Sequence, residues 1–149
     1  MVQHGAGYYL SAKVISTRTN GTEMLNNENL KGYNLPLGAT NILTSGKEYG
    51  GIFPVWNWNR IPGTTAIQHP DSARLEGYLF GKNRYGGGVS NGKNGVIAYE
   101  HCYKGVKAKK AYFFMNDVLL CLGTDIASNA PEEVVTTCLL YTSPSPRDS

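Results

Sequence analysis

Two carboxylates and three side-chain amides lie within seven residues of one stretch, residues 22–33 (T-E-M-L-N-N-E-N-L-K-G-Y). They belong to Glu23, Glu28, Asn26, Asn27 and Asn29. Groups of this kind serve binding and catalysis when a rigid scaffold presents them on a loop. The alternative is a solvated loop rich in Asx-turns, because such side chains readily bond their own backbone. The residues alone leave both interpretations open.

The same stretch has no apolar period of 3.6 or of 2, so we expect neither a helix nor a strand there. A polar loop is therefore predicted from residue 17 to residue 34. The elements that hold it must come from the flanking sequence.

Composition and spacing predict that these elements are strands. The 149 residues correspond to one domain, and 18 glycines with 10 tyrosines favour a β-rich protein with many tight turns. Apolar alternation predicts strands at residues 8–14, 40–43, 77–80, 96–99, 108–115 and 118–122, the last two flanking a turn at Asn116-Asp117. Many short strands between turn signals predict an all-β fold, an antiparallel sandwich.

The charge, the lack of long apolar runs and the cysteine spacing argue against several classes of function. A net charge of +3 without a basic block interleaved with aromatics does not favour nucleic-acid binding. No apolar run approaches the roughly 18 residues that a membrane helix needs, and we expect no membrane partner. Cys102, Cys121 and Cys138 lack metal-ligand spacing, so no metal and no cofactor is predicted. Cys121 is expected to be a buried thiol.

Two further patterns have competing interpretations. The glycine-rich run 81–95 lacks the Gly-Lys-Ser/Thr ending of a phosphate loop, which favours turns and bulges around Asn91-Gly92 and Asn94-Gly95. Trp56 and Trp58 share one face of an extended segment. They fit a sugar-stacking platform or a hydrophobic core, and the general fate of large aromatics favours the core.

The C-terminal segment does not look native. Residues 138–149 (C-L-L-Y-T-S-P-S-P-R-D-S) resemble the translation of a sequencing-library adapter read in frame. We therefore expect residues 1–137 to be the natural part. The strand pattern begins almost at once, which suggests a start inside a longer protein.

Several collinear motifs together resemble polysaccharide lyase family 8, the family of chondroitin AC, hyaluronate and xanthan lyases. They are T-E-x-x-N-x-E-N-x-x-G (residues 22–32), P-V-W-x-W-x-x-I-P-G-T-T (54–65), A-K-K-A-Y-F-F (108–114) and L-G-T-D-I (122–126). The resemblance covers nearly all of residues 4–137 and is most similar to the chondroitin AC branch.

The resemblance implies a secreted or periplasmic enzyme in which an N-terminal α/α toroid and a large antiparallel β super-sandwich share a cleft. Residues 1–137 would be the N-terminal portion of the central β domain. The implied substrate is an acidic polysaccharide containing uronic acid, cleaved by β-elimination. The segment alone is expected to be inactive, because the helical domain of the same chain is its necessary partner.

The same resemblance assigns the site residues. The Asn, His, Tyr and Arg that act on the sugar belong to the helical domain in this family. The β domain contributes a Glu and an Asn, which fall on Glu23 and Asn26 here. Glu23 would orient the catalytic Arg and Tyr, and Asn26 would hydrogen-bond that network or the bound sugar. Glu28 and Asn29 are expected to maintain the loop.

Two other classes of function remain as alternatives to part of a lyase. One is a non-catalytic carbohydrate-binding β-sandwich, and the other is a purely structural sandwich. An upstream helical region bearing Asn, His, Tyr and Arg in the parent gene would favour the lyase.

Overall fold

A computed structural model describes residues 1–68 and 77–139. The predicted tail therefore falls mostly outside the described residues, which end at Leu139. Within them every strand pair is antiparallel and the one helical element is a 3-10 turn, η1 (Gly32–Asn34), which confirms the all-β prediction.

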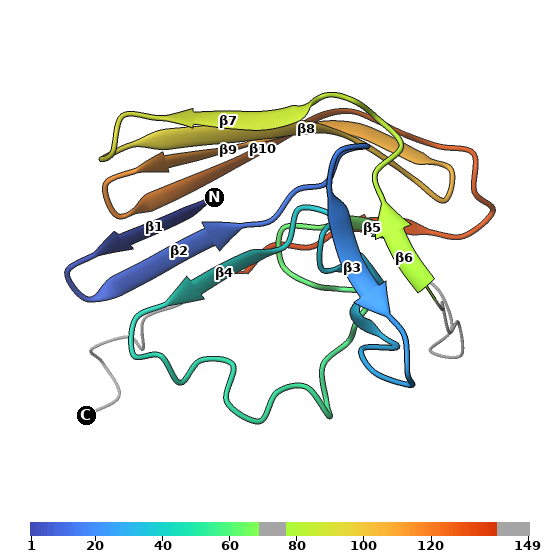
Figure 1. Ribbon diagram of the computed structural model, residues 1–149, viewed down its shortest axis with the longest axis horizontal. Coiled ribbons are helices and arrows are strands. Elements are labelled where there is room, and N and C mark those ends of the chain that lie inside the picture. The colour runs from blue at the N-terminus through green and yellow to red at the C-terminus, as the bar shows by residue number, and fades with distance from the viewer. Residues whose placement is uncertain (69–76, 140–149) are drawn as a thin grey trace, which may run out of the picture.

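Two sheets form the layers of a sandwich (Figure 1). The larger has the order β10-β9-β8-β7 and the smaller the order β1-β2-β4. Two short pairs, β3 with β6 and β5 with β11, complete the fold. The strands are β1 (Val2–Gly5), β2 (Tyr8–Ala12), β3 (Asn20–Met24), β4 (Thr40–Leu43), β5 (Thr65–Ile67), β6 (Gly77–Phe80), β7 (Gly86–Ser90), β8 (Gly95–Tyr103), β9 (Val106–Met115), β10 (Val118–Ser128) and β11 (Val134–Thr136).

The core lies between the two layers. Its buried members come from β2 and the residues just after it, from the segment around Leu37, and from β8 and β9: Leu10, Ala12, Ile15, Leu37, Tyr99, Tyr112 and Phe114. Strand β9 illustrates how the sheet faces this core: its residues alternate strictly between buried positions and exposed or half-buried ones. A period of two places alternate side chains on one face, which here packs on β2.

Three sequence predictions need correction. Residues 20–24 form strand β3, although their polar pattern predicted a loop, because β6 pairs with them from a distant part of the chain. The glycine-rich run contains strand β7, paired with β8, and only its 91–94 turn follows the prediction. Cys121 is exposed, because it lies on the edge strand β10.

The outer face of the larger sheet carries exposed apolar side chains. Cross-strand pairing places Val89, Leu120 and Leu122 on the same side, opposite the core, with exposed fractions of 67%, 42% and 49%. Contiguous apolar surface of this kind marks a contact site on a soluble protein. The charged end of the face is formed by Glu100, Lys109 and Asp125.

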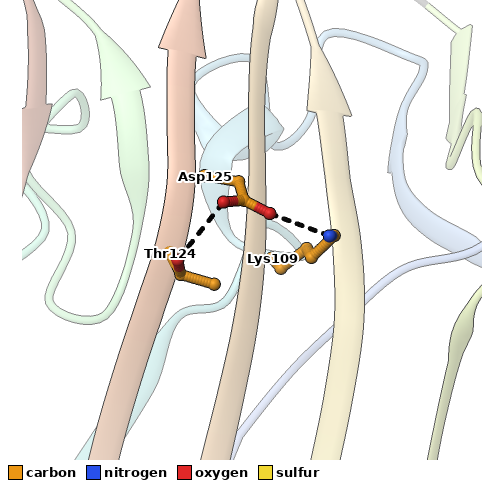
Figure 2. A network of polar contacts seen from close by, with 3 residues as sticks. All are labelled: Lys109, Thr124 and Asp125. Carbon is orange, nitrogen blue, oxygen red and sulfur yellow. Dashed lines mark hydrogen bonds and ion pairs between the residues drawn. The ribbon is translucent and has the colours of Figure 1, made fainter.

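An ion pair lies beside a β-bulge at this charged end of the face (Figure 2). The register of β10 on β9 shifts between Thr124 and Ala127, and Asp125 has a positive φ of 52°. The Asp125 carboxylate lies 2.8 Å from Lys109 Nζ and accepts a 3.4 Å hydrogen bond from Thr124 Oγ1. Since both charged side chains are 61% exposed, solvent screens the pair and it contributes little to stability.

We expect the 149-residue chain to self-associate through this apolar face. Replacing Leu120 and Leu122 together by Lys should shift the chain toward monomer, because the charges would have to be desolvated in any contact. Sedimentation velocity at tens of micromolar measures the change. Val55→Lys is the matched control, because Val55 is 82% exposed but belongs to the 44–58 loop. A wild-type chain that stays monomeric would contradict the expectation.

Candidate functional site

The loop that follows β3 is ordered by consecutive turns. Leu25 O accepts a 2.9 Å hydrogen bond from Glu28 N across Asn26 and Asn27, which both have positive φ (56° and 61°). Two left-handed central residues define a type I′ turn, and Asn tolerates this conformation better than other non-glycine residues. A second turn follows, in which Gly32 N donates to Asn29 O at 3.0 Å. The Asn-rich composition is therefore a requirement of the backbone.

Three motif residues hold this loop together. Asn29 Nδ2 donates to Thr22 Oγ1 at 2.7 Å and to the Glu23 carbonyl oxygen at 3.1 Å, which ties the loop back onto β3. A Cβ at Gly32 would lie 1.9 Å from Asn29 Oδ1, so a larger residue there would displace the Asn29 amide from these hydrogen bonds. The structure thus confirms that the Asn29 amide maintains the loop backbone.

The two predicted site residues are left exposed by this arrangement. Glu23 lies on β3, opposite Tyr78 of β6 in the register, and Asn26 lies in the turn directly after the strand. Within residues 1–68 and 77–139, neither the Glu23 carboxylate nor the Asn26 amide has a hydrogen-bond partner. The described part of the chain therefore presents both groups outward on one short segment, but it does not itself supply what they would contact.

The loop is also anchored to the aromatic segment of the sequence. Tyr33 OH donates to Asn59 Oδ1 at 2.8 Å, and Asn34 Nδ2 donates to Trp58 O at 3.0 Å. The two motifs that sequence reasoning treated separately are thus physically joined. Trp56 and Trp58 are half-buried and outside the core cluster, so the core interpretation is wrong for them. They line a cleft instead.

A buried polar cluster adjoins the core on the inner face of β9 and was not predicted. Lys110 Nζ donates to Gly63 O and to Thr65 Oγ1 (3.1 Å), and burial lowers its pKa to about 8. Tyr112 OH lies 3.0 Å from both Gly38 O and Gly63 O. The only advance signal was a lysine at an inward position of β9. This cluster joins the large sheet to the 38–40 and 63–65 segments, so its role is structural.

We expect the stability of the chain to fall between pH 6.5 and pH 4 because of His101. Burial, with a smaller effect of the Lys110 charge, lowers its pKa to about 4. The unfolded chain binds this proton near pH 6.5 and the folded chain does not. The contribution of the neutral imidazole to stability is therefore complete above pH 6.5 and is lost progressively as the pH falls to 4. The loss amounts to about 3 kcal/mol.

Urea unfolding at several pH values measures this dependence. His101→Gln, which does not titrate, should have a flatter profile between pH 6.5 and pH 4.5 than the wild type. A wild-type profile that is already flat in that range would contradict the prediction, because it would show that His101 binds its proton as readily in the folded chain as in the unfolded chain.

Neither a metal site nor a membrane span is found in the part of the chain that the structure describes. No group of three or more His, Cys, Asp or Glu side chains is arranged to hold a metal ion there. No helix in the described ranges is long and apolar enough to cross a membrane.

Comparison with known proteins places the whole described chain in one group. Residues 1–139 match the model of polysaccharide lyase family 8, super-sandwich domain. Chondroitinase-AC of Pedobacter heparinus is 44% identical over 140 residues, which cover 91% of this chain and 20% of that protein. Hyaluronate lyase of Thermasporomyces composti is 27% identical over 124 residues, covering 78% and 16%.

A solved structure agrees with these matches. A chondroitinase AC lyase, described with enzyme–oligosaccharide complexes, superposes with a TM-score of 0.82 at 42% identity and covers 86% of this chain and 19% of its own. The chain thus spans about a fifth or less of the length of these relatives.

Proposed function

The chain belongs to polysaccharide lyase family 8, and we propose that it is the part of the β domain that supports cleavage of an acidic glycan. The proposed reaction is β-elimination on a uronic-acid-containing polymer of the chondroitin, hyaluronan or xanthan type. The similarity to chondroitinase-AC favours chondroitin among them. Since such polymers are extracellular, we propose that the parent protein acts outside the cytoplasm, either secreted or periplasmic.

The chemistry requires groups that the family resemblance places outside this segment. The C5 proton beside the uronate carboxylate becomes acidic enough only when the developing enediolate charge is stabilised. A base must reach that proton and an acid must reach the leaving oxygen at C4. The family resemblance assigns these tasks to Asn, His, Tyr and Arg of a helical domain. We therefore propose that this segment is inactive without that domain.

The observation that carries the proposal is that the motif residues of β3 and the loop after it have different contacts. Thr22, Asn29 and Gly32 satisfy one another and fix the backbone. Glu23 and Asn26 remain exposed. A fixed carboxylate on one wall of a cleft can orient an Arg and a Tyr on the other wall, because a charge-assisted hydrogen bond is directional and strong. Asn26 is suited to bind a sugar hydroxyl or the same network.

The second candidate is a carbohydrate-binding module without catalysis. The observation that favours it is the aromatic cleft beside the loop, since aromatic rings bind sugars without any catalytic group. The coding sequence around this chain separates the two. A lyase requires an upstream helical region that carries the Asn, His, Tyr and Arg. An upstream region without them would remove the lyase proposal and leave the binding module.

A further inference from the structure

An open aromatic cleft lies between β2, β4 and the 44–58 loop, which passes below β4 in Figure 1. Its volume is about 950 Å³, at the upper end of the range for small-molecule sites. The loop is attached at one end, where Tyr49 OH accepts a hydrogen bond from Ile42 N of β4 at 3.2 Å. At the other end, Asn34 holds the carbonyl of Trp58. The cleft is thus built from fixed parts.

One wall of the cleft is a cluster of four aromatic rings. Trp56 and Trp58 have ring centroids 5.4 Å apart, and Phe53 stacks on Trp56 at 5.9 Å with an interplanar angle of 23°. Tyr49 completes the cluster, 6.0 Å from Trp56. Phe53 is 59% exposed, so the cluster presents ring surface to solvent. Rings at these separations support one another and need little rearrangement to receive a ligand.

The described lining of the cleft has amide and hydroxyl groups but no charge. Its polar side chains include Asn29, Asn41 and Thr44, and among the described residues no Lys, Arg, Asp or Glu lines it. Asn41 Nδ2 donates to Ser11 Oγ at 3.2 Å, which fixes the orientation of the amide. A carboxylate or a sulfate would lose its hydration here without gaining a cation. The chemistry therefore selects an uncharged ligand with apolar faces and a polar rim.

We propose that this cleft binds an uncharged pyranose unit of the glycan, of the N-acetylhexosamine class, by stacking on Trp56 and Trp58. A pyranose ring has C–H groups on its faces and hydroxyls at its edge, which matches flat rings beside amides. The acetamido methyl group adds apolar surface. The assignment of this sugar rests on the proposed function. Asn29 lines the cleft and donates a hydrogen bond to the Glu23 carbonyl oxygen of β3, so the two sites are contiguous.

Intrinsic fluorescence of the 149-residue chain tests the proposal directly, because Trp56 and Trp58 are its only tryptophans. Titration with an unsulfated chondroitin tetrasaccharide should give a saturable change in emission. Free N-acetylgalactosamine should give the same change at higher concentration, and free glucuronate should give none. Sugar-independent changes that follow protein concentration would show that another protein surface covers the cleft, and would overturn the proposal.

Substitutions localise the binding. Phe53→Ala and Trp56→Ala should each weaken the tetrasaccharide about 10-fold, measured by calorimetry, which corresponds to one decade of Kd. Val55→Ala is the matched control, because Val55 lies between them and outside the cleft lining. Phe53 is exposed enough for its truncation to leave the fold intact, and circular dichroism checks this. Equal affinity in all variants would overturn the proposal.

Kinetics of the intact parent protein separate this proposal from the lyase proposal. If the parent cleaves chondroitin, Trp56→Ala should raise KM several-fold with kcat nearly unchanged, since stacking away from C5 binds substrate and transition state alike. An active parent with unchanged KM would refute the sugar site alone. An inactive parent whose isolated chain still binds the tetrasaccharide would refute the lyase alone.

Discussion

Glu23→Gln in the intact parent protein is expected to reduce kcat on the order of 10- to 100-fold, because misplaced catalytic groups cost rates of this size. KM should change little. The substitution keeps the shape of a side chain that is exposed on β3 and removes only its charge. What is lost is the ability to orient a cationic or phenolic partner across the cleft, which matters in the transition state more than in the bound ground state.

Glu28→Gln is the matched control for this prediction. Glu28 lies in the loop directly after β3, carries the same charge and is also exposed, but its contact with the loop is through its backbone N–H. We expect its kcat to stay close to the wild-type value. An unchanged rate for Glu23→Gln, or equal losses for both variants, would remove Glu23 from the site.

Gly63→Ala is expected to destabilise the fold by roughly 3 kcal/mol or more, since it combines backbone strain with a steric clash. Gly63 has a φ of 87°, and a Cβ there would lie 2.3 Å from the carbonyl oxygen of Gly38. Tyr112 OH contacts both carbonyls and Lys110 donates to Gly63, so movement of this segment also breaks buried hydrogen bonds. The glycine of the P-G-T-T motif thus permits a close approach of two backbones.

Gly51→Ala separates the two causes. Gly51 has a φ of 70°, but a Cβ added there would meet no other atom within 4 Å, so only the conformational cost remains, about 1 kcal/mol. Urea unfolding of both variants measures the difference. Equal losses at the two positions would show that the close approach of Gly38 and Gly63 contributes nothing.

Strands were predicted best from the sequence where the pattern depended only on neighbouring residues. Strand β9 alternates clearly, and the turn at Asn116-Asp117 lies between two apolar runs, so the β9–β10 hairpin and its turn were predicted, although β10 continues to Ser128, six residues past the predicted end. β3 was missed, because its partner β6 lies far along the chain and most of its residues are polar. β7 was missed because glycine has low strand propensity, although a Cβ at Gly88 would lie 2.4 Å from Val96 O.

The candidate site was predictable only in part and for the same reason. The family resemblance selected Glu23 and Asn26, and their role stays a prediction. The residues alone could not show that Asn29 bonds back to Thr22, because that contact depends on how the turn closes. They also favoured a core for Trp56 and Trp58, whereas the loop that carries them lies outside the sandwich and exposes them to a cleft.

The most direct test of the account is the product of the intact parent protein acting on chondroitin, hyaluronan and xanthan. β-Elimination creates a carbon–carbon double bond conjugated with the uronate carboxylate, which absorbs in the ultraviolet. We expect this absorbance to rise with at least one of the three polymers, and to rise much more slowly for Glu23→Gln than for Glu28→Gln. A folded parent protein that releases no unsaturated uronate from any of them would contradict the account.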